Sequence, residues 1–246
     1  MTFLTKEAAQ ALRLDQRPDG KNILFKVVAM PGQYVLHYLE GKEEHFRGIS
    51  TAHLARAFGA NAVDSGWLPP GVCRWGRLPS DDWMVRFYPA LSYTLQFGMP
   101  EHKDSFSLSV HLPGMVFAGI GNTYYVWAIK DHQFSQHAPL FVVPLSNVWG
   151  DGRICYGANH PPAVSSEAWQ MIEEAWHFFI ASPFLGDLAN GKSRAHPQDV
   201  RLQLVQAARS PDKQYPLDDL LPYTINDTAV TVKQAVDMLV KSGSTR

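Results

Sequence analysis

The segment NVWGDGRICYGANHPP, residues 147–162, places Cys155 between a glycine-rich turn and a double proline. An unperturbed thiol has a pKa of about 8.5, so a small part of it is thiolate at neutral pH, and a thiolate can attack an activated acyl group without a strong base beside it. A cysteine at the end of a strand can equally be a small buried side chain. The residues around Cys155 must decide between these two interpretations.

Two polar residues near Cys155 have side chains suited to acyl transfer. Asn147 stands eight residues before the cysteine, and its amide can donate a hydrogen bond to the negative charge that develops on a reacting carbonyl oxygen. An asparagine before a glycine-rich turn also commonly bonds to nearby backbone, and the two roles can coexist. His160 stands five residues after the cysteine and can assist an incoming amine near neutral pH, although it also fits a surface loop.

The only other cysteine, Cys73, has no such neighbours, and we interpret it as a packing residue among Trp67, Val72 and Trp75. The two cysteines could form a disulfide in principle, but a reducing compartment favours free thiols. Together with His160 or His137 they make only a weak metal site, because structural zinc prefers clustered ligands. The GxGxxG, GxxxxGK[ST], HExxH and GxSxG motifs are absent from the sequence. We therefore expect neither a metal nor a cofactor.

Composition and charge point to a globular protein with a protein or small-molecule partner. Of the 246 residues, 46% are hydrophobic and 18% are charged, which is ample for a buried core. The net charge of -1 provides no overall field that would favour nucleic acid or an anionic membrane. The opening residues lack the apolar run of a secretory signal, and no stretch approaches the ~20 apolar residues that cross a bilayer. These features predict a cytoplasmic protein.

Short runs of β-branched and aromatic residues predict antiparallel strands. Residues 23–30 and 33–40 flank Pro31-Gly32 as in a β-hairpin, and a helix capped by Ser50 or Thr51 is expected over 51–58. The proline- and glycine-rich stretch 65–82 is predicted to be a long packed loop. Further strands are expected at 83–88, 105–112, 115–118, 124–130 and 139–144, most simply as a meander. Residues 147–156 then read as strand, turn and strand.

Helical periodicity follows the double proline. A helix is expected to start at Ser165 or Ser166 and to stop before Pro183, with a hydrophobic stripe that packs on the sheet. The stripe consists of Trp169, Ile172, Trp176, Phe179 and Ile180. Two later helices are predicted over 197–209 and 231–240. The whole pattern is that of an α+β protein.

The residues around Cys155 resemble the active-site segment of ubiquitin-conjugating enzymes. These enzymes carry His-Pro-Asn, then a glycine, and a catalytic cysteine eight residues after the asparagine. Asn147 and Cys155 have this spacing, and Gly152-Arg153-Ile154-Cys155 matches the Gly-x-Ile/Val-Cys ending, while Leu145-Ser146 replaces His-Pro. The run 139–157, with Trp67-Leu-Pro-Pro upstream, is similar to prokaryotic family D of these enzymes. That family includes the protein B of PRTRC plasmid systems and conjugating enzymes of bacterial ubiquitin-like operons.

The resemblance implies a ubiquitin-conjugating-enzyme-like (UBC-like) fold, an antiparallel meander packed on a helix, over residues 80–182. Residues 1–79 would add a β-hairpin, a short helix and a loop, and residues 183–246 a helical extension, within one compact unit. The implied activity accepts a ubiquitin-like protein from an activating enzyme as a thioester on Cys155 and transfers it to an amine, with Asn147 stabilising the oxyanion. A JAB-type peptidase is a further implied partner, and nucleic acid and membranes are not.

Two other functions remain compatible with the residues. A cysteine hydrolase or peptidase would use Cys155 with one of the histidines, although no Cys-His motif identifies the partner. A non-catalytic module would bind a ubiquitin-like protein on the same scaffold and keep Cys155 as a packing residue.

Overall fold

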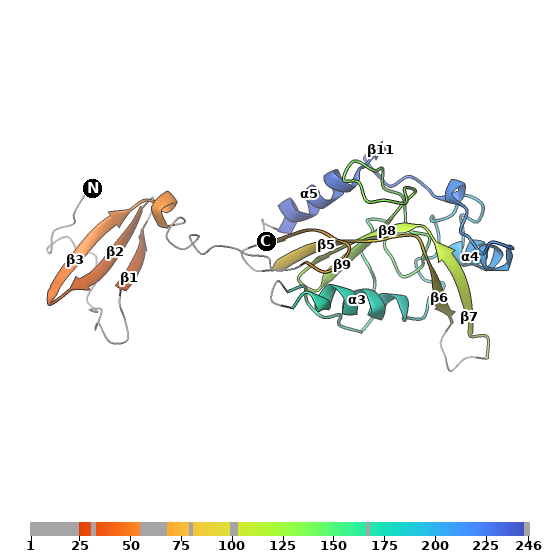
Figure 1. Cartoon of the computed structure of the whole chain (residues 1–246), viewed down its shortest axis with the longest axis horizontal. Coiled ribbons are helices and arrows are strands. Elements are labelled where there is room, and N and C mark those ends of the chain that lie inside the picture. Colours follow the sequence, from red (N-terminus) through yellow and green to blue (C-terminus); the bar gives the residue numbers. More distant parts are fainter. Residues whose placement is uncertain are drawn as a thin grey trace. The chain divides into compact units, whose positions relative to one another are not determined.

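The computed structural model describes residues 25–30, 33–54, 68–78, 81–98, 103–165 and 168–243. The chain divides into two compact units, residues 1–64 and 65–246, which are drawn in Figure 1. The domain boundaries predicted at 79/80 and 182/183 both fall within the second unit. The three-part division of the chain stays a prediction.

The first unit contains a three-stranded antiparallel sheet in the order β1-β2-β3. Its strands are β1 (Phe25–Met30), β2 (Gln33–Glu40) and β3 (Glu43–Ile49). The predicted hairpin is confirmed by the β1–β2 pairing. The sequence does not predict β3, because its glutamates, histidine and arginine obscure the alternation of apolar and polar residues that marks a strand. Residues 51–54 are helical, and the Ser50 hydroxyl accepts a bond from the His53 amide as expected of a cap. The predicted helix end at Phe58 lies outside the described residues.

The second unit is built on a four-stranded antiparallel sheet in the order β4-β5-β8-β9. The strands are β4 (Val72–Arg77), β5 (Asp82–Tyr88), β8 (Gly114–Ile120) and β9 (Thr123–Ile129). The prediction of a loop throughout 65–82 is therefore wrong for residues 72–77 and for Asp82, while residues 65–67 and 79–80 lie outside the described residues. Prolines and glycines flank this stretch and mask its period, but the backbone pairs with β5 through a register shift between Val72 and Arg74.

A second strand pair, β6 (Leu91–Phe97) and β7 (Phe106–Leu112), continues the β5–β8 ladder. Tyr88 pairs with Met115 and Leu91 with Leu112, so both pairings have the same register. Pro89 and Pro113 interrupt the ladder between them, because proline has no N–H to donate. β5 and β6 thus form one side of a long interrupted hairpin, and β7 and β8 form the other. With β4 next to β5 and β9 next to β8, neighbours in the sheet are also neighbours along the chain, as in a meander.

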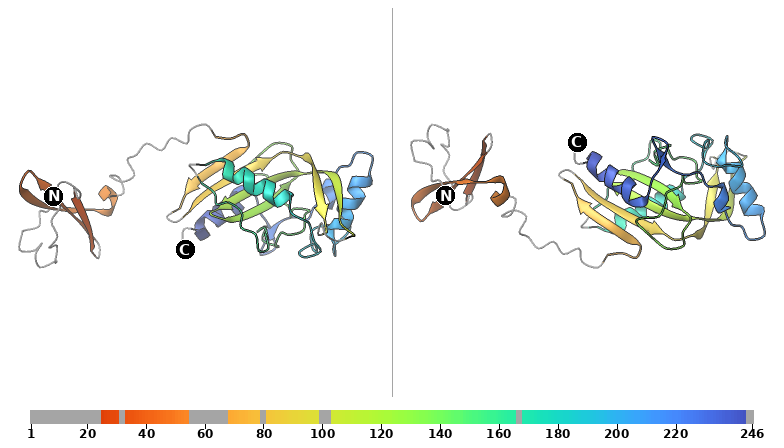
Figure 2. Two further views of the ribbon diagram at one scale, coloured as in Figure 1. Left: turned by 90° about the horizontal axis from the view of Figure 1, so that it is seen from below. Right: turned by 90° about the horizontal axis from the view of Figure 1, so that it is seen from above.

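Helices cover both faces of this sheet. Figures 1 and 2 show α3 (Gln170–Ile180) against one face and α5 (Val232–Gly243) against the other. Residues of β8 alternate between the two sides, so that Phe117 packs with Trp176 of α3 while Val116 belongs to the cluster that contains Val236 of α5. The predicted role of the aromatic stripe as a core face is confirmed, because Ile172, Trp176 and Phe179 are buried.

The helices begin slightly later than the sequence predicts. The N-cap of α3 is Trp169, which makes no side-chain cap bond, so the predicted start at Ser165 is wrong. The alternative start, Ser166, lies outside the described residues. Trp169 instead packs edge-on against Trp75 of β4, with 5.4 Å between the ring centroids. The helix predicted over 197–209 is α4 (Val200–Arg209), where Asp199 caps the Arg201 amide. It packs against β7.

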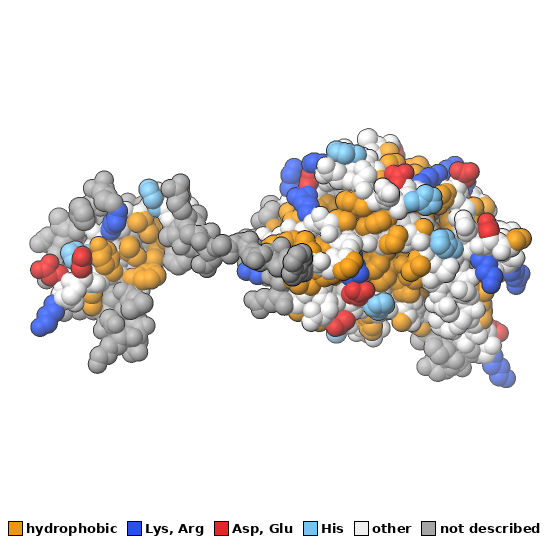
Figure 3. Space-filling view, in the orientation of Figure 1, with side chains coloured by type: hydrophobic (Ala, Val, Ile, Leu, Met, Phe, Trp, Pro, Cys, Tyr) orange, Lys and Arg blue, Asp and Glu red, His pale blue; other side chains and the backbone are white. Residues whose placement is uncertain are grey.

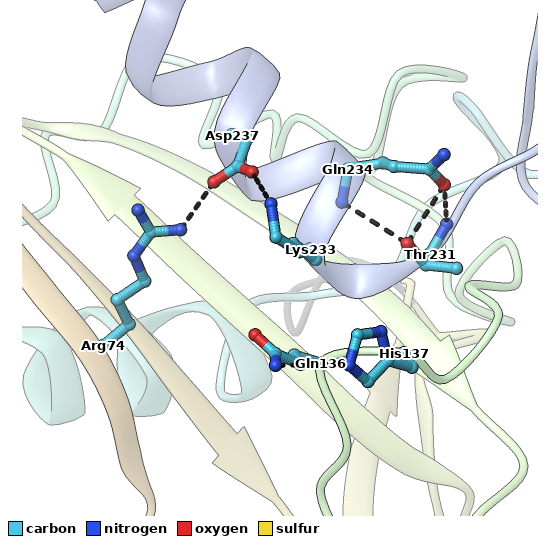
Figure 4. A network of polar contacts seen from close by, with 7 residues as sticks. All are labelled: Arg74, Gln136, His137, Thr231, Lys233, Gln234 and Asp237. Carbon is cyan, nitrogen blue, oxygen red and sulfur yellow. Dashed lines mark hydrogen bonds and ion pairs between the residues drawn. The ribbon is translucent and has the colours of Figure 1, made fainter.

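Helix α5 is fixed to β4 by a small polar network, shown in Figure 4. Asp237 pairs with Arg74 of β4 at 2.6 Å and with Lys233 one turn earlier on α5. Hydrogen bonds from these two cations lower the pKa of the Asp237 carboxyl to about 2. Thr231 and Gln234 form a reciprocal capping pair at the start of the helix. The C-terminal helix is therefore an integral part of the second unit.

The described chain is a mixed α and β structure with antiparallel sheets, as expected from the sequence. The more specific assignment of the meander to the UBC-like type stays a prediction. Basic and acidic side chains are interspersed on the face of the second unit seen in Figure 3, in keeping with the net charge of -1. None of the helices among the described residues is long and apolar enough to cross a membrane.

Candidate active site

The segment that contains Cys155 folds back on itself as the sequence predicts. Val148 and Ile154 form an antiparallel bridge, flanked by a bond of 2.7 Å from the Cys155 amide to the Asn147 carbonyl. At the other end the Trp149 amide donates to the Arg153 carbonyl at 2.8 Å. We call residues 147–155 the site turn. Its hydrogen bonds make Asn147 and Cys155 direct neighbours across two short strands.

The site turn is attached to the outer edge of the sheet. The Val126 amide of β9 donates to the Gly152 carbonyl at 2.9 Å, and the Ile154 amide donates to the Tyr124 carbonyl of β9 at 2.8 Å. Further along the same edge, Ala128 of β9 forms an isolated antiparallel bridge with Phe141. No named strand forms over the predicted range 139–144, but its residues make isolated bridges. The edge of β9 therefore positions the cysteine.

Gly152 is the residue that allows the turn to lie against β9. Its φ is 88°, a conformation that side chains disfavour, and an added Cβ would lie 2.4 Å from Nε1 of the buried Trp127. Gly150, two residues earlier, has no atom within 4 Å of its would-be Cβ and no positive φ. The Gly-x-Ile-Cys pattern thus has a steric cause in this chain.

We expect Gly152→Ala to lower the free energy of unfolding by about 2–5 kcal/mol, because backbone strain and overpacking against Trp127 add together. Gly150→Ala is the matched control and should change stability by less than about 0.5 kcal/mol. Urea unfolding followed by tryptophan fluorescence measures both values. Equal effects of the two substitutions would show that the close approach to Trp127 is unimportant.

Asn147 occupies the left-handed backbone region, with φ 62°, which asparagine tolerates better than most residues. Its Nδ2 donates to the Pro183 carbonyl at 2.8 Å, just beyond the end of α3. One Nδ2 hydrogen is used in this bond, and the amide carries a second. The backbone of Asn147 therefore has a turn conformation, but its side chain bonds a carbonyl 36 residues away in the sequence and not the nearby backbone. The oxyanion role stays a prediction.

Cys155 is partly exposed and is not disulfide-bonded. The next residue, Tyr156, anchors it to the protein, since the Tyr156 hydroxyl donates to the Ala175 carbonyl of α3 at 3.3 Å. The Tyr156 ring also stacks on Phe178, with 5.8 Å between centroids, and meets Tyr124 edge-on. The backbone at Cys155 is thus held by β9 on one side and by α3 on the other.

The other candidates from the sequence lie in different surroundings. Cys73 on β4 is partly buried and its Sγ donates to the Gly71 carbonyl at 3.2 Å. Burial raises the pKa of the Cys73 thiol to about 11, which leaves little reactive thiolate at neutral pH. His160 is exposed in the loop after the site turn. In the ranges that the structure describes, no three His, Cys, Asp or Glu residues are grouped to hold a metal ion.

Sequence reasoning did not identify Lys192, which also contacts the site turn. Its Nζ donates to the Val148 carbonyl at 2.6 Å, and the side chain is only 3% exposed. Within the described parts of the chain, no carboxylate pairs with this ammonium group. Burial lowers the pKa of Lys192 to about 8. A lysine in a polar loop gives no sequence signal for such a contact.

The backbone beside Lys192 is fixed by a buried carboxylate. Asp219 accepts hydrogen bonds from the Tyr215 hydroxyl and, at 2.7 Å, from the Ala195 amide. Burial alone would raise the pKa of Asp219, but these hydrogen bonds lower it below its usual range. The carboxylate therefore remains charged and holds the loop from which Lys192 reaches the site turn.

The lowered pKa of Lys192 predicts a pH dependence of stability. In the unfolded chain the amine binds its proton up to about pH 10.5, and in the folded chain only up to about pH 8. The unfolded state thus binds more protons between these values, so the contribution of Lys192 to stability rises with pH across this window. At 1.36 kcal/mol per pKa unit the rise is about 3 kcal/mol.

Urea unfolding at several pH values, for the wild type and for Lys192→Met, isolates this contribution. The difference between the two proteins should shift in favour of the wild type from pH 8 to pH 10.5, and should be constant below pH 7. A constant difference throughout would show that Lys192 titrates normally.

Comparison with curated proteins and with solved structures found no significant match. A comparison with protein-family models did find one, over residues 48–223. This range includes the whole sheet of the second unit, the site turn, α3 and α4. It covers well over half of the chain and agrees with the resemblance found around Cys155. The protein belongs to prokaryotic E2 family D.

Proposed function

We propose that this protein is a conjugating enzyme that carries a ubiquitin-like protein as a thioester on Cys155 and transfers it to an amine. Membership of an E2 family supports ubiquitin-like conjugation in general. The observation that supports the specific site is the cross-strand pairing of Asn147 with the partly exposed Cys155, at 2.7 Å between backbone atoms. The partners are a ubiquitin-like protein and its activating enzyme.

The first half-reaction exchanges one thioester for another. The Cys155 thiolate attacks the carbonyl carbon of the thioester on the activating enzyme, a new C–S bond forms, and the thiolate of the activating enzyme leaves. No redox change occurs, and no strong base is required because the leaving thiol and the attacking thiol are chemically alike. This step needs a thiol that a large partner can reach, which fits the partial exposure of Cys155.

The second half-reaction forms an amide. The acceptor amine attacks the thioester carbonyl, negative charge develops on the carbonyl oxygen, and the Cys155 thiolate then leaves while the amine gives its proton to solvent. The second Nδ2 hydrogen of Asn147 is the proposed donor to this oxyanion. The bond from the same nitrogen to the Pro183 carbonyl orients the amide before the reaction begins.

The test is a reaction with candidate ubiquitin-like and activating partners from one genomic neighbourhood and ATP. We expect an adduct on non-reducing gels that thiols reverse, with mass spectrometry assigning it to Cys155. Without the activating enzyme or ATP it should not form. Failure with a partner pair that is verified to form its own thioester would favour a non-catalytic binding module, and turnover by water alone would favour a cysteine hydrolase.

The biological setting follows from the same proposal. A JAB-type peptidase that processes the ubiquitin-like protein is a further expected partner, as in the PRTRC and bacterial ubiquitin-like systems that the sequence resembles. The proposed place of action is the cytoplasm, where the thiol stays reduced.

A further inference from the structure

The outer edge of the site turn carries a carbonyl that the turn itself cannot satisfy. In the Val148–Ile154 bridge the cross-strand bonds are made by the neighbouring residues, so the Val148 carbonyl points away from the partner strand. Val148 is only 1% exposed, and a buried carbonyl needs a donor. Lys192 Nζ supplies it at 2.6 Å. The lysine therefore takes the place that a further strand would have next to residues 147–149.

An ammonium group is an energetically unfavourable hydrogen-bond donor for a buried carbonyl, because its charge must be removed from water. Removing a charge from water costs free energy that a single carbonyl offsets only in part, and within the described residues no acidic side chain pairs with Lys192. A backbone amide or a neutral side chain would satisfy the carbonyl at lower cost. A buried charge beside a candidate site is therefore a candidate for a functional role.

Two contacts from one segment hold consecutive residues of the site turn. The Pro183 carbonyl accepts a hydrogen bond from the Asn147 side-chain amide, and the Lys192 ammonium donates one to the Val148 carbonyl. Both Pro183 and Lys192 lie in the stretch that follows α3, which is visible in Figure 2. The Asn147 side chain can keep its direction only if the backbone at 147 and 148 stays in place. The contact of Lys192 with Val148 fixes this backbone from the side opposite to Cys155.

We propose that Lys192 is a positioning residue for amide formation: its bond to the Val148 carbonyl holds Asn147 in register with the Cys155 thiol. This inference rests on the proposed function. Loading depends mainly on the thiol itself, whereas discharge depends on a correctly placed oxyanion donor. Lys192 therefore acts on discharge, and it acts through Asn147.

The test compares Lys192→Met with Gln203→Met, a substitution of another buried polar residue, which lies on α4, the helix that packs against β7. Each variant is loaded and then chased with free lysine in a single turnover. We expect Lys192→Met to load within about twofold of the wild type and to discharge about 10-fold more slowly. Gln203→Met should match the wild type in both steps.

A double-mutant cycle separates positioning from general loosening of the fold. If Lys192 acts through Asn147, the double variant Lys192→Met/Asn147→Gly should discharge no more slowly than Asn147→Gly alone. The inference would be overturned if the fold-losses in discharge rate of the two single variants multiplied in the double variant. It would also be overturned if Lys192→Met discharged at the wild-type rate, or if this variant lost loading and discharge equally. If Lys192→Met does not fold, Lys192→Gln replaces it, because its shorter uncharged side chain also releases the Val148 carbonyl.

The two proposals fail in different ways. A wild-type protein that never forms a thioester on Cys155 with a verified partner pair overturns both the proposed function and the role of Lys192. A wild-type protein that loads and discharges normally, together with an unchanged Lys192→Met variant, overturns the role of Lys192 alone.

Discussion

Cys155→Ala should abolish the thiol-reversible adduct, whereas Cys73→Ala should form it at the wild-type rate. The two cysteines are both partly buried, but Cys155 lies in the site turn while burial raises the pKa of Cys73 to about 11. Only Cys155 stands eight residues after an asparagine in the site turn, and the raised pKa of the Cys73 thiol leaves that cysteine little thiolate at neutral pH. The reaction is followed on non-reducing gels with the same partner proteins, and the loss for Cys155→Ala should be complete.

Cys155→Ser extends the same experiment. A serine that accepts the acyl group forms an oxygen ester, which thiols do not cleave, so any adduct of this variant should persist in reducing buffer. Circular dichroism and thermal unfolding establish that each variant is folded. An adduct that survives in Cys155→Ala, or that disappears in Cys73→Ala, would remove Cys155 as the carrier.

Asn147→Gly should preserve loading and slow discharge to amines by about 10²-fold, the effect expected when an oxyanion donor is removed. Glycine adopts the positive φ of Asn147 without strain, so this variant removes the amide while it leaves the backbone conformation available. Asn147→Ala should show the same kinetic loss and be less stable than Asn147→Gly, because alanine tolerates φ 62° poorly.

The comparison between these variants distinguishes the two roles of Asn147. Single-turnover discharge to free lysine gives the chemical effect, and urea unfolding gives the structural one. Discharge by Asn147→Gly at the wild-type rate would leave Asn147 with a structural role only, as the donor to the Pro183 carbonyl. Loss of stability without loss of discharge would support the same conclusion.

The replacement of His-Pro by Leu145-Ser146 has a structural counterpart. Leu145 and Ser146 are both fully buried, so the residues before Asn147 serve as core. The Ser146 hydroxyl finds no hydrogen-bond partner among the residues that the structure describes, which is a cost that alanine would avoid. Burial, rather than a His-Pro pair, anchors the entry to the site turn in this protein.

The local sequence pattern predicted α3 and the strands that consist of apolar and aromatic runs. The stripe of α3 recurs at helical spacing, and β8 and β9 are continuous runs of apolar and aromatic residues. The local pattern failed at β4, where prolines and glycines surround the strand, and at β6, where Pro89 and exposed polar residues conceal the continuation of β5. Tertiary pairing stabilises both strands despite their weak local signals.

The sequence by itself determined the local geometry of the candidate site. The distance of eight residues between Asn147 and Cys155, with glycines between them, is sufficient for a tight turn that pairs the two residues, because all the bonds involved are short-range. Only the tertiary structure decided what holds this turn. Pro183 lies 36 residues from Asn147, and Lys192 lies 44 residues from Val148. No periodic pattern encodes such contacts, since they arise only when β9 and α3 pack together and bring the following segment against the site turn.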